Sequence, residues 1–266
     1  MTSYTGIDDL AVSLDGNVLS VTLNRPDSLN SLTEEMLTAL AETLERAAGD
    51  PGVRVVRLAG AGRGFCSGAG ISAEDRASAA RSTAVDGTLG AANRAVRAIV
   101  ASPKPVVAVV QGPAAGVGVS LAVASDLVLT SEKSFFLLAF TRIGLMPDGG
   151  ATALVAAAIG RIRAMRMALL AERITAAEAL EYGLVSGVYP DEELEAAAAG
   201  VIDTLVSGPA VALSRTKQAI NAAALTELDA AIARESEGQQ ILLGSRDFLE
   251  GTRAFQQRRK PTFTDG

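Results

Sequence analysis

The spacing of apolar residues predicts strands that alternate with helices in the first part of the chain, followed by helices alone. Short apolar runs typical of strands occupy residues 10–14, 18–23, 53–58, 106–110, 126–129, 135–138 and 185–189. The segment 209–258 is helix-rich. This order predicts an α/β class, with a core over residues 1–200 and a C-terminal helical region over 201–266.

Local signals refine several of these elements. Asp15-Gly16 lies between the first two runs and predicts a hairpin turn. The sequences Ser31–Glu34 and Thr175–Glu178 each predict a capping box at a helix start, and Gly183 predicts the end of the second helix. Residues 72–101 are rich in Ala and Arg and predict helix, with a break near Asp86-Gly87.

Composition narrows the functional classes. The 266 residues hold 24 Lys plus Arg against 30 Asp plus Glu, and a net charge of -6 disfavours a nucleic-acid binder. The chain has no His and a single Cys, Cys66, which excludes Ser-His-Asp catalysis and His-ligated metals. No uncharged apolar stretch reaches about 18 residues, and the polar, acidic start has no leader pattern. We expect a cytoplasmic protein without membrane partners.

Two glycine-rich loops are the strongest candidate for a binding site. Residues 60–70 and 111–118 each follow a predicted strand and precede a probable helical segment. Backbone N–H groups at such a position can bind an anion or a developing oxyanion. Either loop alone is better explained as an ordinary tight turn. Neither fits a P-loop or a dinucleotide-binding fingerprint.

Ordered motifs along nearly the whole chain make the sequence similar to a known family. The matching pieces are Asn24-Arg25-Pro26, Leu29-Asn30-Ser31-Leu32, the loop 60–69, Lys104–Ala108, Gln111–Gly118, Ile143–Gly150, Tyr182-Gly183-Leu184-Val185, and Phe255 with Arg258-Arg259, Pro261 and Phe263. In this order they resemble the crotonase family of acyl-CoA enzymes, which includes enoyl-CoA hydratases and isomerases.

The resemblance implies both a fold and a substrate class. The expected fold is a spiral of ββα units with a C-terminal helical region that builds homotrimers, often paired into homohexamers. The expected substrate is an acyl-CoA thioester, with coenzyme A entering as part of the substrate and with no metal or redox cofactor. By position, the backbone N–H groups of Ala69 and Val117 would bind the thioester oxygen.

The resemblance also implies coenzyme A contacts. Arg25 and Arg258 are candidates for phosphate contacts because Arg suits phosphate oxygens. The other candidate substrate contacts lie on the two loops and on the segment after the second loop: Ser67, Gly68, Gly116 and Phe140. For any single Arg, a solvated surface position is the competing interpretation.

Departures from the family's hydratase pattern point to an isomerase. Hydratases use two Glu side chains, and their positions correspond here to Ser120 and Phe140, neither of which can exchange a proton as a carboxylate does. Asp148 follows Pro147 at a position where some branches place an acid/base. The run 139–148 looks most like the epoxyphenylacetyl-CoA isomerase and enoyl-CoA delta-isomerase branch. One carboxylate beside an oxyanion hole suffices to shift a double bond.

Three alternatives stay open at the level of sequence. Pro-Asp-Gly is a turn sequence and Asp is a favoured helix cap, so Asp148 is either a cap or a base. The chain is also compatible with a non-catalytic acyl-CoA-binding protein, or with a hydratase that uses atypical acids. The acyl group and the choice between trimer and hexamer stay open.

Overall fold

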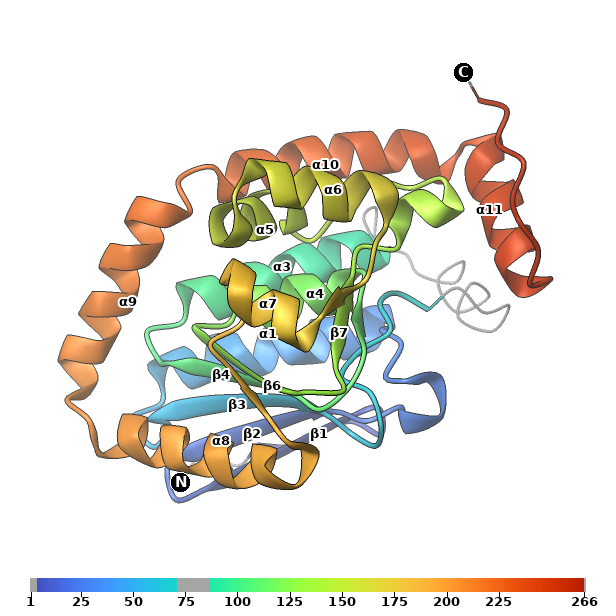
Figure 1. The fold of residues 1–266 in the computed structure, drawn as a ribbon. Coiled ribbons are helices and arrows are strands. Elements are labelled where there is room, and N and C mark those ends of the chain that lie inside the picture. The colour runs from blue at the N-terminus through green and yellow to red at the C-terminus, as the bar shows by residue number, and fades with distance from the viewer. Residues whose placement is uncertain (1–3, 71–86, 266) are drawn as a thin grey trace.

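The α/β class predicted from the sequence is confirmed by the computed structural model, which describes residues 4–70 and 87–265 (Figure 1). The strands are β1 (Leu10–Asp15), β2 (Val18–Leu23), β3 (Val55–Gly60), β4 (Val106–Val110), β5 (Ala114–Ala115), β6 (Leu127–Ser131), β7 (Phe135–Leu137), β8 (Ile174–Thr175) and β9 (Gly187–Tyr189).

Helices fill most of the remaining chain. The short 3₁₀ helices are η1 (Pro26–Ser28) and η2 (Phe140–Ile143). The α-helices are α1 (Glu34–Gly49), α3 (Gly87–Ala101), α4 (Val117–Ala124), α5 (Ala151–Ile159), α6 (Arg161–Leu170), α7 (Ala176–Tyr182), α8 (Asp191–Ser207), α9 (Ala210–Ala224), α10 (Leu228–Leu243) and α11 (Arg246–Gln256). The predicted helical stretch 72–86 lies outside the described residues.

A six-stranded sheet in the order β1-β2-β3-β4-β6-β9 forms the base of the molecule. The hairpin predicted at Asp15-Gly16 is confirmed, because β1 pairs antiparallel with β2 and Asp15 lies opposite Val18. All later pairs in this sheet are parallel. Every residue of β4 is buried, as expected for a strand covered on both faces.

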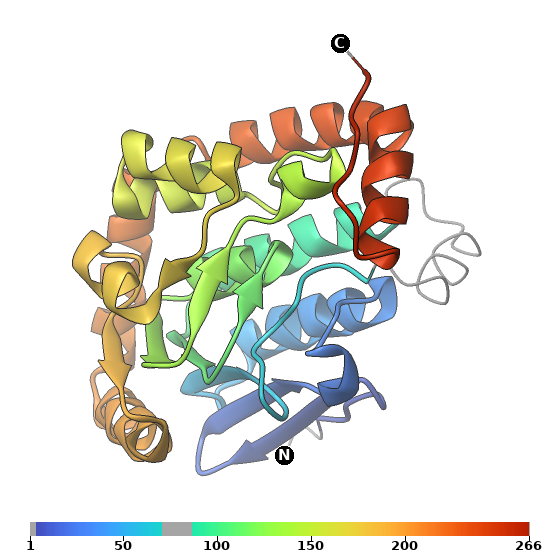
Figure 2. The ribbon, with the colours of Figure 1, turned by 45° about the vertical axis from the view of Figure 1, so that its right-hand side comes forward.

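Two apolar cores lie on opposite faces of this sheet. Val106, Ala108 and Val110 belong to the larger core, which also contains the buried faces of α1 and α3. Val107 and Val109 alternate with them and belong to a smaller core beneath α8. This two-residue alternation lets one short strand support both layers. Figure 2 shows α8 at the lower left of the sheet, with α1 and α3 on its other side.

Helix starts follow the sequence signals in one case and depart from them in another. The capping box of α7 is confirmed, with Thr175 accepting from the Glu178 amide and Gly183 at the C-cap with φ +84°. The capping box predicted at Ser31 is wrong, because α1 is capped by Thr33 instead. The Ser31 hydroxyl contacts Arg25 and Ser28 in the preceding loop, so it is not available to the helix.

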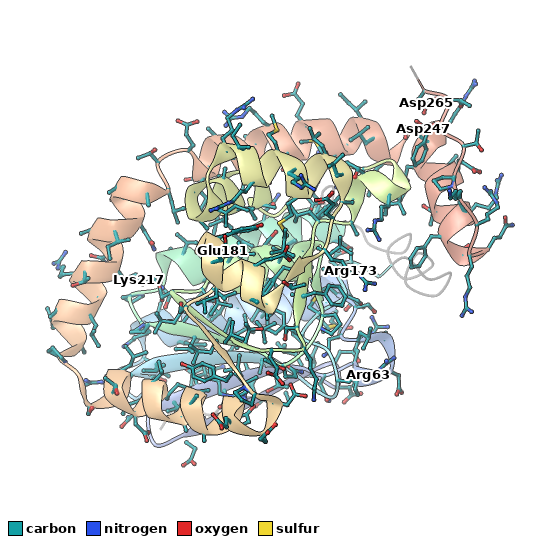
Figure 3. The ribbon with its side chains drawn as sticks, in the orientation of Figure 1. Arg63, Arg173, Glu181, Lys217, Asp247 and Asp265 are labelled. Carbon is teal, nitrogen blue, oxygen red and sulfur yellow. The ribbon has the colours of Figure 1, made fainter. Side chains whose placement is uncertain are left out.

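The C-terminal helices wrap the core. Lys217 reaches from α9 toward the body of the molecule and pairs with Asp126 at 2.8 Å (Figure 3). Its ammonium also donates to the carbonyl oxygens of Ile99 and Lys104. These contacts fix α9, and α10 then continues across the molecule against α5 (Figure 1).

Helix α8 spans residue 200, where the sequence analysis places a boundary. Among residues 4–70 and 87–265, no single helix has the length and hydropathy to cross a membrane. The pair α8 and α9 reaches those limits only when the two are joined across a bend of 108°.

Candidate active site

The two glycine-rich loops predicted to bind an anion lie side by side. The amide of Ala115 in the second loop donates to the carbonyl of Cys66 in the first at 2.8 Å. Gly68 has φ +90°, and a Cβ built there would lie 3.0 Å from the Ala115 carbonyl oxygen. Only glycine can adopt this positive φ and also lie so close to the backbone of the second loop. The loops therefore bring residue 69 beside the start of α4.

Two backbone amides at this junction lack acceptors. Leu32 donates to the Gly68 carbonyl and accepts from the Gly70 amide, a parallel bridge that leaves the Ala69 N–H unused. Val117 is the first residue of α4, where an N–H has no intrahelical partner. Within the part of the chain that the structure describes, neither amide donates a hydrogen bond. The predicted pair is thus adjacent in space and available to an external oxygen.

Asp148 lies in the turn before α5, and its carboxyl group is buried. Gln239 Nε2 donates to Oδ2 at 2.6 Å, whereas Oδ1 has no partner among the described residues. Burial raises the pKa of Asp148 to about 7; the Gln239 hydrogen bond opposes this rise and the nearby Glu235 charge adds to it. A carboxyl group with this pKa is half ionised near neutral pH, as an acid/base requires.

The sequence left open whether Asp148 is a helix cap, and its contacts exclude that role. The N-cap residue of α5 is Gly150, with φ +75°, and as a glycine it has no side chain that could cap the helix. Glu235 of α10 performs the function of a cap instead, accepting from the Gly150 amide at 2.6 Å and from the Thr152 amide at 2.8 Å. The Asp148 carboxyl is therefore not engaged by the helix start.

Helix α4 connects Asp148 to the Val117 amide. The Ser120 hydroxyl donates to the Asp148 carbonyl oxygen at 2.9 Å. A Cβ built on Gly149 would lie 3.2 Å from Ser120 Oγ and 3.7 Å from Val117 Cγ1. The turn that carries Asp148 thus packs directly against the first turn of α4, where the unpaired Val117 amide lies.

The two positions that hold Glu in hydratases have other contacts here. The Ser120 hydroxyl is buried and bonded to backbone, as described above. The Phe140 ring lies about 3.7 Å from a Cβ built on Gly116, so it packs on the turn that precedes the Val117 amide. Neither side chain can exchange a proton with a substrate carbon.

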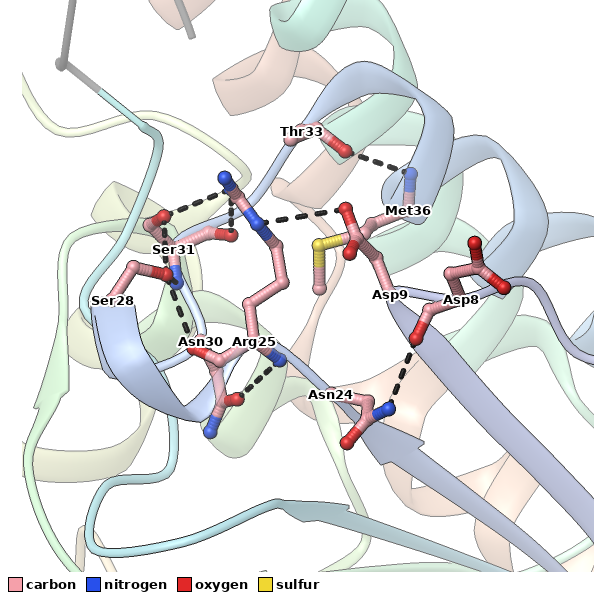
Figure 4. A network of polar contacts seen from close by, with 9 residues as sticks. All are labelled: Asp8, Asp9, Asn24, Arg25, Ser28, Asn30, Ser31, Thr33 and Met36. Atoms are coloured by element: carbon pink, nitrogen blue, oxygen red, sulfur yellow. Dashed lines mark hydrogen bonds and ion pairs between the residues drawn. The ribbon is translucent and has the colours of Figure 1, made fainter. Parts of the chain in front are cut away.

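Two candidate coenzyme A contacts, Arg25 and Ser67, make hydrogen bonds within the protein. Arg25 donates to the Ser31 carbonyl and hydroxyl and pairs with Asp9 at 3.5 Å (Figure 4). The Ser67 hydroxyl donates to the Ser28 carbonyl at 2.9 Å. These bonds hold the 25–31 segment against the first glycine-rich loop. Contacts of Arg25 and Ser67 with coenzyme A stay a prediction.

Arg258 lies far along the chain, after α11. It has φ +54° and lines a cavity of about 370 Å³ with Arg142, Phe255, Gly251 and residues 259–261. Several cations around one cavity would suit a phosphate group. The role of Arg258 toward coenzyme A also stays a prediction.

Comparison with known proteins identifies the family. A sequence model described as enoyl-CoA hydratase/isomerase matches residues 14–266. The chain belongs to the enoyl-CoA hydratase/isomerase family. The crotonase resemblance drawn from the ordered motifs is therefore confirmed.

Relatives in this family carry both activity names. The chain is 39% identical to 1,2-epoxyphenylacetyl-CoA isomerase of Escherichia coli, over 94% of this chain and 96% of the relative. It is also 39% identical to a probable enoyl-CoA hydratase of Rhodobacter capsulatus, over 92% of this chain and 93% of the relative. The names of these relatives leave isomerase and hydratase both possible within the family.

A solved structure supports the same fold. The crystal structure of an enoyl-CoA hydratase from Mycobacterium avium subsp. paratuberculosis matches with a TM-score of 0.91 and 62% identity, over 98% of this chain and all of that chain. The predicted crotonase fold is confirmed by this match together with the parallel sheet.

Sequence reasoning missed two residues of the site, Gln239 and Glu235. Both lie on α10, more than 80 residues after Asp148, and both are buried. Their spacing of four residues places them on one face of a helix. This spacing is the only feature of the sequence that could have indicated that the two side chains act together. The thiol of Cys66 is buried, and burial raises its pKa to about 12.

Proposed function

We propose that this family member is an acyl-CoA isomerase that moves a double bond in an enoyl-CoA thioester. Asp148 is the acid/base, and the amides of Ala69 and Val117 bind the thioester oxygen. The observation that carries the proposal is the buried Asp148 carboxyl group, with one unpartnered oxygen, on a turn that packs against the helix start that holds the unpaired Val117 amide.

The reaction follows from these groups. Ionised Asp148 removes a proton from the γ-carbon of a 2-enoyl thioester, and the electron pair moves through the double bond onto the thioester oxygen. The two amides stabilise that dienolate, and one such donor is worth about 3 kcal/mol of barrier. The protonated Asp148 carboxyl exchanges its proton with solvent in a fraction of turnovers and then protonates the α-carbon, which gives the 3-enoyl thioester. The steps run equally in reverse and need no metal or redox cofactor.

Hydration is the less supported activity because it requires a second group that activates water. Ser120 and Phe140 occupy the two hydratase acid positions, and neither supplies a carboxylate. The same observation favours a second candidate function, an acyl-CoA-binding protein without catalysis. The homotrimer or homohexamer expected from the resemblance is part of either proposal.

Proton exchange in heavy water separates these possibilities. A panel of 2-enoyl- and 3-enoyl-CoA thioesters is incubated with the wild type, with Asp148→Asn and with a matched control, Asp203→Asn, on the exposed face of α8. We expect deuterium uptake and a shifted double bond with the wild type and the control, and neither with Asp148→Asn. Exchange that persists in Asp148→Asn refutes the proposal. Binding without exchange favours the binding protein, and a hydroxyacyl-CoA product favours the hydratase.

A further inference from the structure

Helix α10 presents two buried polar side chains to the turn that carries Asp148. Glu235 and Gln239 lie one helical turn apart and both are nearly inaccessible to solvent, at 1% and 2% exposed. Between them, Gly238 approaches the turn so closely that a Cβ there would lie 2.4 Å from Met146 Sδ. Buried polar groups at such a close contact require fixed partners.

Gln239 has its orientation set by two bonds to one residue. Its Oε1 accepts from the Met146 amide at 3.3 Å, and its Nε2 donates to the Met146 carbonyl at 3.0 Å. The second hydrogen of Nε2 reaches Asp148 Oδ2 at 2.6 Å. Exchange of the amide oxygen and nitrogen would break all three bonds, so the donor end must face Asp148.

The Glu235 carboxylate is also held in place by hydrogen bonds, but it affects Asp148 through its charge and not through a direct hydrogen bond. Its two oxygens accept from the Gly150 and Thr152 amides, and Oε1 also accepts from the Thr152 hydroxyl at 2.5 Å. Burial raises the pKa of Glu235, those hydrogen bonds lower it, and Arg234 lowers it further. Burial is the largest of these effects, so the pKa of Glu235 is raised overall. When Glu235 is ionised, its like charge disfavours ionisation of Asp148.

Few other polar groups face the Asp148 side chain. From α4, the Ser120 hydroxyl is directed to the Asp148 backbone carbonyl and not to its carboxyl group. From α10 come the Gln239 donor and the Glu235 charge. Gln239 and Glu235 are thus the two groups among the described residues that bias the Asp148 carboxyl, and they act in opposite directions.

We propose that Gln239 is a positioning residue that holds Oδ2 of Asp148, so that Oδ1 is the oxygen that takes and returns the proton, while the Glu235 charge opposes the ionised state. This inference rests on the proposed role of Asp148 as the base. The bond to Gln239 stops the carboxyl from rotating and offering either oxygen, which keeps one basic atom aligned with the substrate carbons. Gln239 touches no substrate, so it acts only through Asp148.

The opposite effects of Gln239 and Glu235 on the Asp148 carboxyl predict opposite pH shifts of kcat. A residue that only stabilises the fold would produce no such shift. Gln239→Met removes the donor from the ionised carboxylate at nearly constant side-chain volume, so the acidic limb of the kcat–pH profile should move to higher pH. A hydrogen bond to a charged group is worth enough to move it by about one pH unit or more. The loss in kcat should then be about tenfold at pH 6 and largely disappear at pH 9. Glu235→Gln removes the like charge and should move the limb to lower pH.

The experiment measures kcat and KM for proton exchange from pH 5.5 to 9 on wild type, both variants and Glu237→Gln, an exposed neighbour on α10 that should match the wild type. Gln239→Glu is the second variant at this position, because it keeps an acceptor for the Met146 amide and should also move the limb upward. We expect opposite shifts at positions 239 and 235 with KM nearly unchanged. Equal losses at all pH values, or shifts of the same sign, overturn the inference.

The Asp148→Asn variant distinguishes failure of the proposed isomerase function from failure of the positioning role of Gln239. If Asp148→Asn retains exchange, the proposed function fails and the pH signature at Gln239 has no basis. If Asp148→Asn abolishes exchange while the Gln239 variants keep the wild-type profile, only the positioning role is refuted.

Discussion

Substitution of Asp148 by Asn should stabilise the folded protein at neutral and alkaline pH. The pKa of this carboxyl group rises from 3.8 to about 7 on folding, chiefly through burial. The folded state therefore holds the proton more tightly than the unfolded state. The stability that the protonated group contributes is complete below pH 3.8 and is lost as the pH rises through about 7.

The size of the effect follows from the same values. A rise of about three pH units corresponds to about 4 kcal/mol, the amount by which ionising Asp148 lowers the free energy of unfolding above pH 7. Asn at this position can still accept the Gln239 hydrogen bond but cannot ionise. The free energy of unfolding of Asp148→Asn relative to wild type should therefore increase by about 2–3 kcal/mol between pH 5 and pH 8.

Urea denaturation of both proteins at several pH values and one protein concentration measures this difference, and other titrating groups cancel from it. Asp203→Asn, on the exposed face of α8, serves as the control and should show no such trend. A difference between Asp148→Asn and wild type that stays constant from pH 5 to pH 8 would show that Asp148 titrates as an ordinary carboxyl. That result would remove the main physical argument for its role as a base.

Three further predictions address the rest of the structure. Because the base must be ionised, the wild-type exchange rate should rise about tenfold between pH 6 and pH 8; a rate that is flat over this range contradicts a pKa near 7. Gly68→Ala should lower the exchange rate at least about tenfold, because a Cβ at φ +90° would meet the Ala115 carbonyl and displace the Ala69 amide; a normal rate would exclude that amide. Lys217→Met should cost about 2 kcal/mol in urea denaturation by leaving the half-buried Asp126 without its ammonium partner, and unchanged stability would show that the pair does not hold α9.

The sheet and its hairpin could be predicted because their signals are local. The Asp15-Gly16 signal marks the hairpin, although the two turn residues are Gly16 and Asn17, and the apolar run 106–110 marks β4, both without reference to the rest of the chain. The start of α1 was less predictable, since Ser31 and Thr33 both suit an N-cap. The loop containing Arg25 engages the Ser31 hydroxyl, so a tertiary contact selects Thr33.

The oxyanion amides were predictable in part. Glycine-rich sequence marks both loops, but only the folded chain shows that the bridge at Leu32 leaves Ala69 unpaired beside Val117. The contacts of Gln239 and Glu235 could not be predicted. Their residue types are common on exposed helix faces, and α10 reaches the Asp148 turn only after α9 has carried the chain around the core.

The interpretation of Asp148 as a helix cap is excluded by a residue on a distant helix. Helix α5 needs an acceptor for its first amides, and Asp148 precedes it at a position where an acceptor is expected. Glu235 supplies that acceptor from α10, which can approach because Gly150 has no Cβ; one built there would lie 2.7 Å from Leu228. Because the helix start is already satisfied, the Asp148 carboxyl is left buried with one unpartnered oxygen. The same carboxylate that caps the helix then makes ionisation of Asp148 harder, so capping and acid/base tuning are two effects of one side chain.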